Sequence, residues 1–399
     1  MNSSVGTGTE ICPLQIEVRQ EQVAELLGRI AAARWPSKEL VDDRSQGVQL
    51  ATLHALASYW STEYDFRRIE ARLNALPQFM TEIDGVAIHF IHVKSRHENA
   101  LPLLITHGWP GSVIELLGVI GPLTDPTAHG GGAGDAFDLV VPSLPGYGLS
   151  GEPTEVGWDQ TRIAQAWAKL MTRLGYARYV AAGGDWGAAV TDALGHQAPE
   201  GLIGIHVNLL VTEPPPQVAH PTGTAEEREA AQALTTERQT GFAYFLEQAT
   251  RPQTIGYALL DSPVALAGWM LDPDADAYDK IARAFAGGQP AGGLTRDHIL
   301  DNITLHWLRG TGASAARLYW EAARAQALTA DQAPPAVTLP VGFTVFPGEI
   351  FRAPRSWVKQ QYPTLVYYHQ VDRGGHFAAW EEPELYATEI RATFGSLRR

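Results

Sequence analysis

The chain has 399 residues, of which 45% are hydrophobic and 19% are charged, so it can bury a core large enough for one domain with insertions or for two domains. Its net charge of −14 argues against nucleic acids and anionic membrane surfaces as partners, because both would repel the chain. The single cysteine, Cys12, excludes an intrachain disulfide and a cysteine-built metal site. We therefore predict a cytoplasmic protein that uses no metal.

The first 80 residues carry helical patterns. Spaced apolar positions predict a helix over most of residues 14–35, which Pro36 stops. Further helical stretches are expected at about 47–63 and 64–80. No signal peptide and no membrane span are expected, because no segment has the required apolar run. We predict an N-terminal helical extension, residues 10–78.

A strand pattern begins near Phe79. The turn signal Asp84-Gly85 predicts a hairpin of strands at 80–83 and 86–93. Strands alternating with helical stretches imply a largely parallel sheet, and in such sheets the reactive residues follow the carboxyl ends of the strands. Further strands are expected at 101–106, 137–142, 179–182, 202–210, 341–346 and 365–371.

Two proline-rich breaks divide the second half of the chain. The first, at 213–217, ends the strand pattern, and the second, at 332–340, restores it. The residues between the breaks have helical patterns. We predict a helical lid, residues 213–335, inserted into an α/β core made of residues 79–212 and 336–399.

The motif Gly183-Gly184-Asp185-Trp186-Gly187 follows an apolar strand and precedes a small-residue helix. Strand, glycine-flanked turn and helix form the nucleophile elbow of α/β-hydrolases, which usually carries serine at the position of Asp185. A carboxylate there would attack carbon and form an alkyl ester, whereas a serine forms an acyl ester. The alternative interpretation is a glycine-rich turn in which Asp185 caps the helix.

An acid and a histidine follow in the order that α/β-hydrolases require. The strand at 341–346 leads to Glu349, and the strand at 365–371 leads to His376. His376 would deprotonate the water that attacks an ester on Asp185, and Glu349 would orient the imidazole. Each residue alone could be an ordinary loop residue, but the three together in this order are unlikely to arise by chance.

The loop after the strand at 101–106 reads His107-Gly-Trp-Pro-Gly-Ser112. Its position predicts an oxyanion hole made of two backbone N–H groups, those of Trp109 and Trp186. We assign His107, Gly108 and Pro110 of the same loop to substrate binding. The alternative is a turn that only connects a strand with a helix.

An aspartate at the elbow moves the expected chemistry toward the opening of epoxides or the displacement of halides. Opening an epoxide releases an alkoxide, so it requires a proton donor that faces the nucleophile, whereas halide displacement requires none. Phenolic hydroxyls from the lid would serve. Composition and spacing cannot choose among the lid tyrosines, which are Tyr244, Tyr257, Tyr278 and Tyr319.

Over nearly its whole length, the chain resembles the microsomal-type epoxide hydrolases, which include juvenile hormone epoxide hydrolases and bacterial relatives. The similar segments are 34–36, 59–67, 107–112, 142–150, 183–187 and 373–379. The resemblance implies Asp185 as nucleophile, His376 as base and Glu349 as its partner. It also implies ring-opening tyrosines at Tyr244, four residues before Gln248, and at Tyr319, shortly before an acidic residue.

These observations predict cofactor-free hydrolysis of a small apolar or aryl epoxide by water, giving a vicinal diol. Two alternatives stay open at this point. A haloalkane or haloacid dehalogenase also uses an aspartate elbow followed by tryptophan, and a ligand-binding α/β-hydrolase would show no turnover. The sequence leaves the physiological substrate and a homodimer open.

Overall fold

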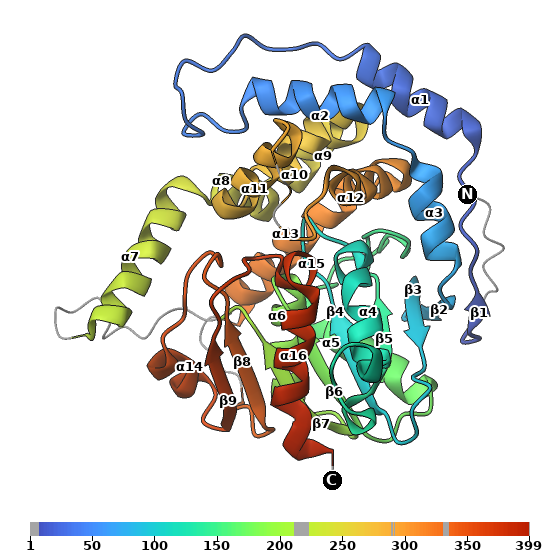
Figure 1. Ribbon diagram of the computed structural model, residues 1–399, viewed down its shortest axis with the longest axis vertical. Helices are drawn as coiled ribbons and strands as arrows, with labels where there is room; N and C mark the ends of the chain where they lie inside the picture. Colours follow the sequence, from blue (N-terminus) through green and yellow to red (C-terminus); the bar gives the residue numbers. More distant parts are fainter. Residues whose placement is uncertain (1–7, 211–222, 289, 291, 330–334, 399) are drawn as a thin grey trace.

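The computed structural model describes residues 8–210, 223–288, 290, 292–329 and 335–398. Within these residues one nine-stranded sheet forms the centre of the molecule, in the order β1-β2-β3-β5-β4-β6-β7-β8-β9 (Figure 1). Strands β1, β2 and β3 pair antiparallel at one edge, and β3 also pairs antiparallel with β5. The remaining six strands, in the sheet order β5-β4-β6-β7-β8-β9, are parallel to one another. The strands are β1 Cys12–Pro13, β2 Gln78–Ile83, β3 Val86–Val93, β4 Leu101–Thr106, β5 Phe137–Pro142, β6 Tyr179–Gly183, β7 Leu202–Val207, β8 Val341–Val345 and β9 Leu365–Gln370.

Helices cover both faces of the sheet, which explains why the central strands are apolar at successive positions. In β4, Leu103 and Ile105 pack into one core cluster and Leu104 packs into the other. The first face is covered by α4 and α16, and the second by α5, α6 and α14. The core helices are α4 Ile120–Thr124, α5 Gln160–Arg173, α6 Trp186–Gln197, α14 Arg355–Gln361, α15 Ala378–Glu381 and α16 Pro383–Phe394, with 3-10 turns η1 Val113–Val119, η2 Pro126–Ala128, η3 Ala133–Asp135 and η5 Gly395–Leu397.

The predicted hairpin and the later strands are confirmed, but two helix predictions near the N-terminus were too long. Helix α1 spans only Gln20–Ala31. The preceding residues are extended, because the buried Ile16 and Val18 donate their backbone N–H groups to side chains of α3. Helix α2 spans Leu50–Thr62, close to the expected stretch. Helix α3 spans Phe66–Asn74 and ends early because residue 78 begins the pairing of β2 with β3.

Seven helices follow β7 and form the lid, which we define as residues 223–329. The helical prediction for this region is confirmed within the described residues, and the first proline-rich break, at 213–217, lies outside them, as does the predicted boundary between 212 and 213. The lid helices are α7 Ala225–Thr240, α8 Ala243–Thr250, α9 Pro252–Asp261, α10 Pro263–Leu271, α11 Ala275–Phe285, α12 Arg296–Arg309 and α13 Gly312–Leu328.

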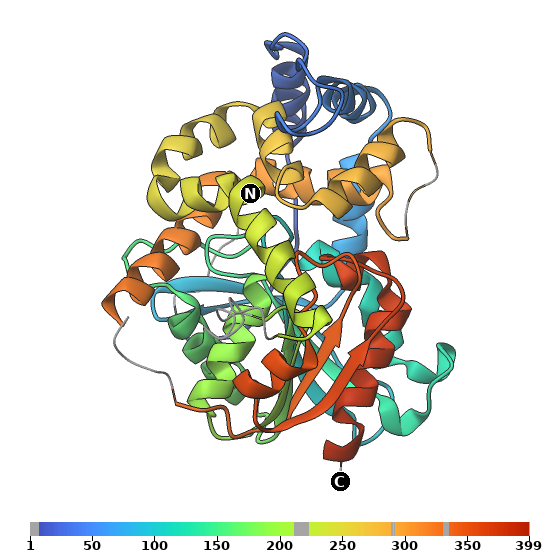
Figure 2. The ribbon, with the colours of Figure 1, turned by 90° about the vertical axis from the view of Figure 1, so that its left-hand side faces the viewer.

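The N-terminal arm, residues 14–77, lies on the lid (Figure 1). Helices α1 and α2 pack on α10, α2 also packs on α11, and α3 packs on α12. The indole N–H of Trp60 donates to Thr304 Oγ1 at 2.9 Å, and Arg68 pairs with the fully buried Asp301 at 2.7 Å. Figure 2 shows the arm and most of the lid helices at one end of the molecule with the sheet below them, whereas α7 extends down beside the sheet. No described helix is long and apolar enough to cross a membrane.

Candidate active site

The turn between β6 and α6 has the geometry of a nucleophile elbow. Asp185 adopts φ 49° and ψ −127°, a strained conformation for a residue with a side chain. The flanking glycines permit it, because a Cβ on Gly187 would lie 1.9 Å from the carbonyl oxygen of Thr106. A Cβ on Gly183 would lie 2.2 Å from that of Gly187. The Asp185 side chain makes no capping hydrogen bond to α6, which argues against the interpretation of Asp185 as a helix cap.

The two carboxylate oxygens of Asp185 have different partners. Oδ1 accepts a hydrogen bond from the backbone N–H of Trp109 at 2.7 Å, and Oδ2 lies 3.4 Å from Nε2 of His376. Trp186 occupies the first position of α6, where backbone N–H groups have no partner within the helix. The predicted oxyanion residues therefore lie on both sides of the predicted nucleophile.

Glu349 and His376 are brought together by two loops that touch. Gly348 and Gly375 form a parallel β-bridge, so the residues that follow them are neighbours. Nδ1 of His376 lies 2.6 Å from Oε1 of Glu349. Burial opposes charge on the His376 ring, but the nearby charges of Glu349 and Asp185 and their hydrogen bonds raise its pKa well above the usual value. The three residues expected from chain order thus form one connected set.

The four lid tyrosines lie in different environments. Tyr257 is 68% exposed, and the hydroxyl of Tyr278 is bonded to Thr52 of the N-terminal arm. Tyr244 instead stacks on the indole of Trp109, with ring centroids 5.3 Å apart and planes 13° apart. Tyr319 meets the rings of both predicted oxyanion tryptophans edge to face.

Tyr244 and Tyr319 are also neighbours of each other, with ring centroids 6.1 Å apart. Burial raises the pKa of each hydroxyl well above its usual value, and the charge of Asp185 adds to this shift. Both phenols therefore keep their protons at neutral pH, as a hydrogen-bond donor to a developing alkoxide must.

The three residues assigned to substrate binding lie in different environments. His107 is fully buried, with Nε2 accepting the N–H of Leu144 and Nδ1 bonded to the carbonyl of Gly108. Burial lowers the pKa of His107 to about 4, so the ring is neutral and supports the loop from within. Gly108 contacts the nucleophile closely, because a Cβ there would lie 2.3 Å from Asp185 Oδ1. Pro110 lines a small cavity under the lid together with Trp109, Tyr244 and His376.

The lid also holds the oxyanion loop in place. Asn302 of α12 donates to the carbonyl oxygen of Pro110 at 2.7 Å and accepts from Ser112 Oγ at 2.7 Å. His306, one turn further along α12, bonds to the carbonyl of Gly111. Sequence reasoning missed these contacts, because nothing in the helical pattern of the lid indicates which polar residues face the core.

Two acids near the nucleophile were also missed. Asp274 of the lid has a buried Oδ2 without a partner among the described residues, and burial raises its pKa. Glu115 belongs to a Ser-x-x-Glu pattern that starts at Ser112, which is typical of an exposed helix cap. The residues around Glu115 are a better indication that it is buried, because Glu115 is the only charged residue in the apolar run 113–117.

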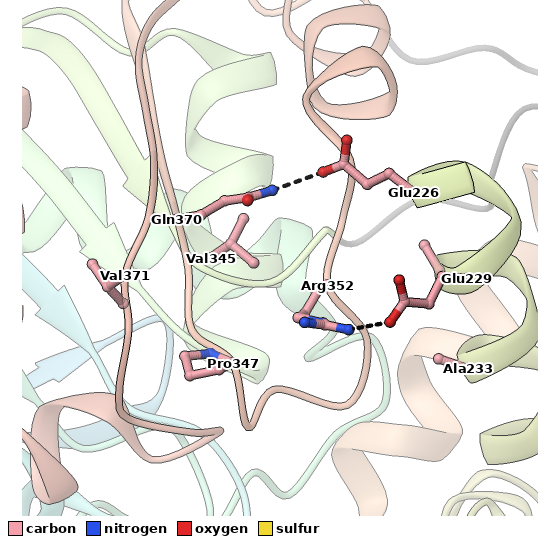
Figure 3. A pocket seen from close by; sticks show the side chains of 9 residues that line it. Glu226, Glu229, Ala233, Val345, Pro347, Arg352, Gln370 and Val371 are labelled. Carbon is pink, nitrogen blue, oxygen red and sulfur yellow. Dashed lines mark hydrogen bonds and ion pairs between the residues drawn. The ribbon is translucent and has the colours of Figure 1, made fainter. Parts of the chain in front are cut away.

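A larger pocket of about 320 Å³ opens on the surface between α7 and the ends of β8 and β9. Two polar contacts cross it, Arg352 with Glu229 at 2.5 Å and Gln370 with Glu226 at 2.7 Å (Figure 3). None of the predicted site residues lines this pocket. Among the residues that the structure describes, no cluster of three or more His, Cys, Asp or Glu side chains is arranged to hold a metal ion.

Comparisons with known proteins identify the family. The family model for the epoxide hydrolase N terminus matches residues 11–116, which span the arm and the oxyanion loop. A Stigmatella aurantiaca protein, whose epoxide hydrolase name is provisional, is 51% identical over 97% of this chain and 86% of its own length. Epoxide hydrolase 1 of Sus scrofa is 34% identical, over 98% of this chain and 89% of its own.

The fold leads to the same family. The crystal structure of juvenile hormone epoxide hydrolase from Bombyx mori superimposes with a TM-score of 0.85 at 29% identity, covering 98% of this chain and 95% of the silkworm chain. The match of the family model to residues 11–116 agrees with these relatives. The chain belongs to the epoxide hydrolase family, with the α/β-hydrolase fold.

Proposed function

We propose that this protein hydrolyses an epoxide to a vicinal diol through a covalent ester on Asp185. The observation that carries the proposal is the placement of two protonated phenols, Tyr244 and Tyr319, against the tryptophans that flank a carboxylate nucleophile. The relatives named above bear the epoxide hydrolase name, which agrees with this chemistry.

In the first step, Oδ2 of Asp185 forms a bond to one epoxide carbon while the bond between that carbon and the ring oxygen breaks. The released oxygen takes a hydrogen bond, and then a proton, from Tyr244 or Tyr319. Oδ1 is the better candidate for the ester carbonyl, since it is already engaged by the N–H of Trp109. No cofactor is required, because nucleophile and acid are both side chains.

In the second step, water attacks the carboxyl carbon of the ester and loses a proton to Nε2 of His376. The N–H groups of Trp109 and Trp186 stabilise the oxyanion, a contribution of about 3 kcal/mol for each donor. Collapse breaks the bond between the carboxyl carbon and the alcohol oxygen, and that oxygen takes the second proton of the water, which gives the diol and restores the carboxylate. The proton on His376 returns to the tyrosinate. Glu349 holds the imidazole in the tautomer that can accept the proton.

The lining of the cavity under the lid supports a small apolar or aryl epoxide as substrate. Its walls are mostly apolar or aromatic, with His376 and Asp274 as the charged or ionisable exceptions. A haloalkane or haloacid dehalogenase needs no ring-opening acid, so the two phenols argue against it. The cytoplasmic location and a homodimer stay predictions.

The decisive test is the variant His376→Gln, incubated with styrene oxide and, separately, with a bromoalkane. Without its base the enzyme should stall as the ester, so intact mass should rise by the whole epoxide on the Asp185 peptide. A gain of the alkyl group alone would indicate dehalogenation. No adduct with either compound, together with tight ligand binding, would indicate a binding protein without turnover.

A further inference from the structure

A second small cavity borders Asp185, and none of the four lid tyrosines lines it. It measures about 20 Å³, and its walls include Gly108, Glu115, Asp185, Asn208 and His376. A cavity needs about 10–15 Å³ to hold one water molecule, so this one has room for water. The cavity under the lid measures about 10 Å³. Only His376 and its neighbour Phe377 line both this cavity and the one under the lid.

Two of the residues that line this cavity each have a polar atom that lacks a partner within the described protein. The two atoms are Oε2 of Glu115 and Oδ1 of Asn208, and both are buried. A buried polar atom without a hydrogen bond is costly, and native structures usually satisfy such atoms with protein groups or bound water. Two such atoms on residues that line one cavity of this size indicate a site for a bound water molecule.

The partners of the remaining atoms fix how these side chains are oriented. Oε1 of Glu115 accepts the backbone N–H of Gly108 at 3.3 Å, which leaves Oε2 as the unpaired oxygen. Nδ2 of Asn208 donates to Oε2 of Glu349 at 3.3 Å, so its carbonyl oxygen points elsewhere. That oxygen lies against the elbow, because a Cβ on Gly184 would be only 2.8 Å from it.

We infer that Glu115 and Asn208 bind the water that hydrolyses the ester, and that they place it between His376 and the carboxyl carbon of Asp185. The inference rests on the proposed function. It assigns roles to two residues outside the Asp185, His376 and Glu349 set, in a cavity that the ring-opening phenols do not line.

The hydrogen-bonding capacities of these groups match those of one attacking water molecule. In the resting enzyme, burial and the charge of Asp185 raise the pKa of Glu115 to about 8. Burial, the larger cause, persists when Asp185 is esterified, and a protonated Glu115 can donate a hydrogen bond. The water accepts from Glu115 and donates to Oδ1 of Asn208 and Nε2 of His376. Its remaining lone pair faces Asp185, where the new carbon–oxygen bond forms as His376 takes the proton.

The test follows formation and decay of the ester separately. Wild type, Glu115→Leu, Asn208→Leu and Glu115→Gln are mixed rapidly with styrene oxide and quenched, and the alkylated enzyme is quantified by intact mass. The leucine variants should form the ester at the wild-type rate but lose it about tenfold more slowly, as expected for one lost hydrogen bond to the water. Glu115→Gln keeps a donor of the same size and should hydrolyse the ester close to the wild-type rate.

A matched control separates this role from a structural one. Glu389 is also a buried glutamate, but its carboxylate bonds to Thr344, Tyr367 and His369, away from both cavities. Glu389→Gln should leave both rates unchanged, and a fold defect would slow ester formation as well as decay. If the ester decays rapidly in both leucine variants while an adduct accumulates in His376→Gln, the inference is wrong but the proposed function stands. No adduct in any variant would overturn the proposed function and the inference with it.

Discussion

The backbone N–H of Trp109 donates to one oxygen of the Asp185 carboxylate, Oδ1, and this makes the two oxygens of the nucleophile chemically distinct. The bonded oxygen is less nucleophilic, since its lone pair is engaged. The other oxygen, Oδ2, faces His376 and is the one we expect to attack. In the proposed mechanism, the N–H group that would stabilise the oxyanion is therefore in place before the substrate reacts.

A covalent ester on Asp185 has a consequence for isotope labelling. If water attacks the carboxyl carbon, a single turnover in water labelled with oxygen-18 should leave the label on Asp185, while the diol carries an unlabelled oxygen from the enzyme. Mass spectrometry of the Asp185 peptide and of the diol measures both. Label in the diol alone would mean that water attacks the epoxide directly.

Replacing the nucleophile should abolish the reaction. Asp185→Asn presents an amide that is a poor nucleophile, so turnover should fall by at least about a thousandfold. Asp192→Asn is the matched control, because Asp192 lies on α6 and bonds to Tyr362 rather than to the oxyanion loop. Steady-state diol formation by both variants checks this, and an Asp185→Asn enzyme with full turnover would contradict it.

The pKa of His376 should depend on the charge of Asp185. In the resting enzyme that charge helps to raise the pKa, whereas forming the ester removes it. The pKa must then fall, which makes His376 a neutral base when water has to be deprotonated. Asp185→Asn imitates the uncharged ester, so an NMR titration should give a lower His376 pKa in that variant than in wild type. An unchanged value would mean that Glu349 alone sets the pKa.

The two lid phenols should act mainly on ring opening. Tyr244→Phe or Tyr319→Phe should each slow ester formation about tenfold, because the other phenol still donates. The double variant should slow it by about a hundredfold or more. Rapid-quench mass measurements follow this step. Tyr257→Phe, on an exposed residue of the same lid, should behave as wild type.

Ionisation of Glu115 should be visible in the pH profile. Its pKa of about 8 is a raised value, so the group is neutral below that pH and charged above it. The ionisable groups around it are Asp185, His376 and Tyr386. Ester hydrolysis should decline as the pH rises through the pKa of Glu115, because the donor to water is lost; since the ester removes the charge of Asp185, which helps to raise this pKa, the decline should be centred at or below about 8. Glu115→Gln should lack this decline.

The arm should contribute to stability through a charge on α12. Arg68→Ala removes a charged partner of the buried Asp301 carboxylate and should destabilise the protein by about 2 kcal/mol. Arg96→Ala breaks an exposed pair with Asp125 and should cost less than about 1 kcal/mol. Denaturant unfolding of both variants measures the difference, and equal effects would argue against a stabilising role for the Arg68 contact.

Much of this architecture could be predicted because local patterns carry it. Glycines around Asp185, a turn signal at Asp84-Gly85 and apolar runs in the strands each act over a few residues. The order of Asp185, Glu349 and His376 could be predicted for the same reason, since each follows a strand of a parallel sheet.

What could not be predicted depends on contacts between distant segments. Composition and spacing left the choice among four tyrosines open, and only the resemblance to a family pointed to Tyr244 and Tyr319; in the structure these are the two whose rings contact Trp109. The extended stretch before α1 arises from bonds between Ile16 and Asn74, which are 58 residues apart. Glu115 has the sequence context of a cap, and only the packing of η1 shows that it reaches the nucleophile.

Helix α12 touches the arm and the oxyanion loop through adjacent residues, Asp301 and Asn302. If α12 moved away from the core, the hydrogen bonds between Asn302 and the loop 107–112 would have to break. Helix α12 therefore links the arm to the loop that contacts Asp185. Substitutions in the arm should therefore lower the catalytic rate as well as the stability, although the arm is remote from Asp185.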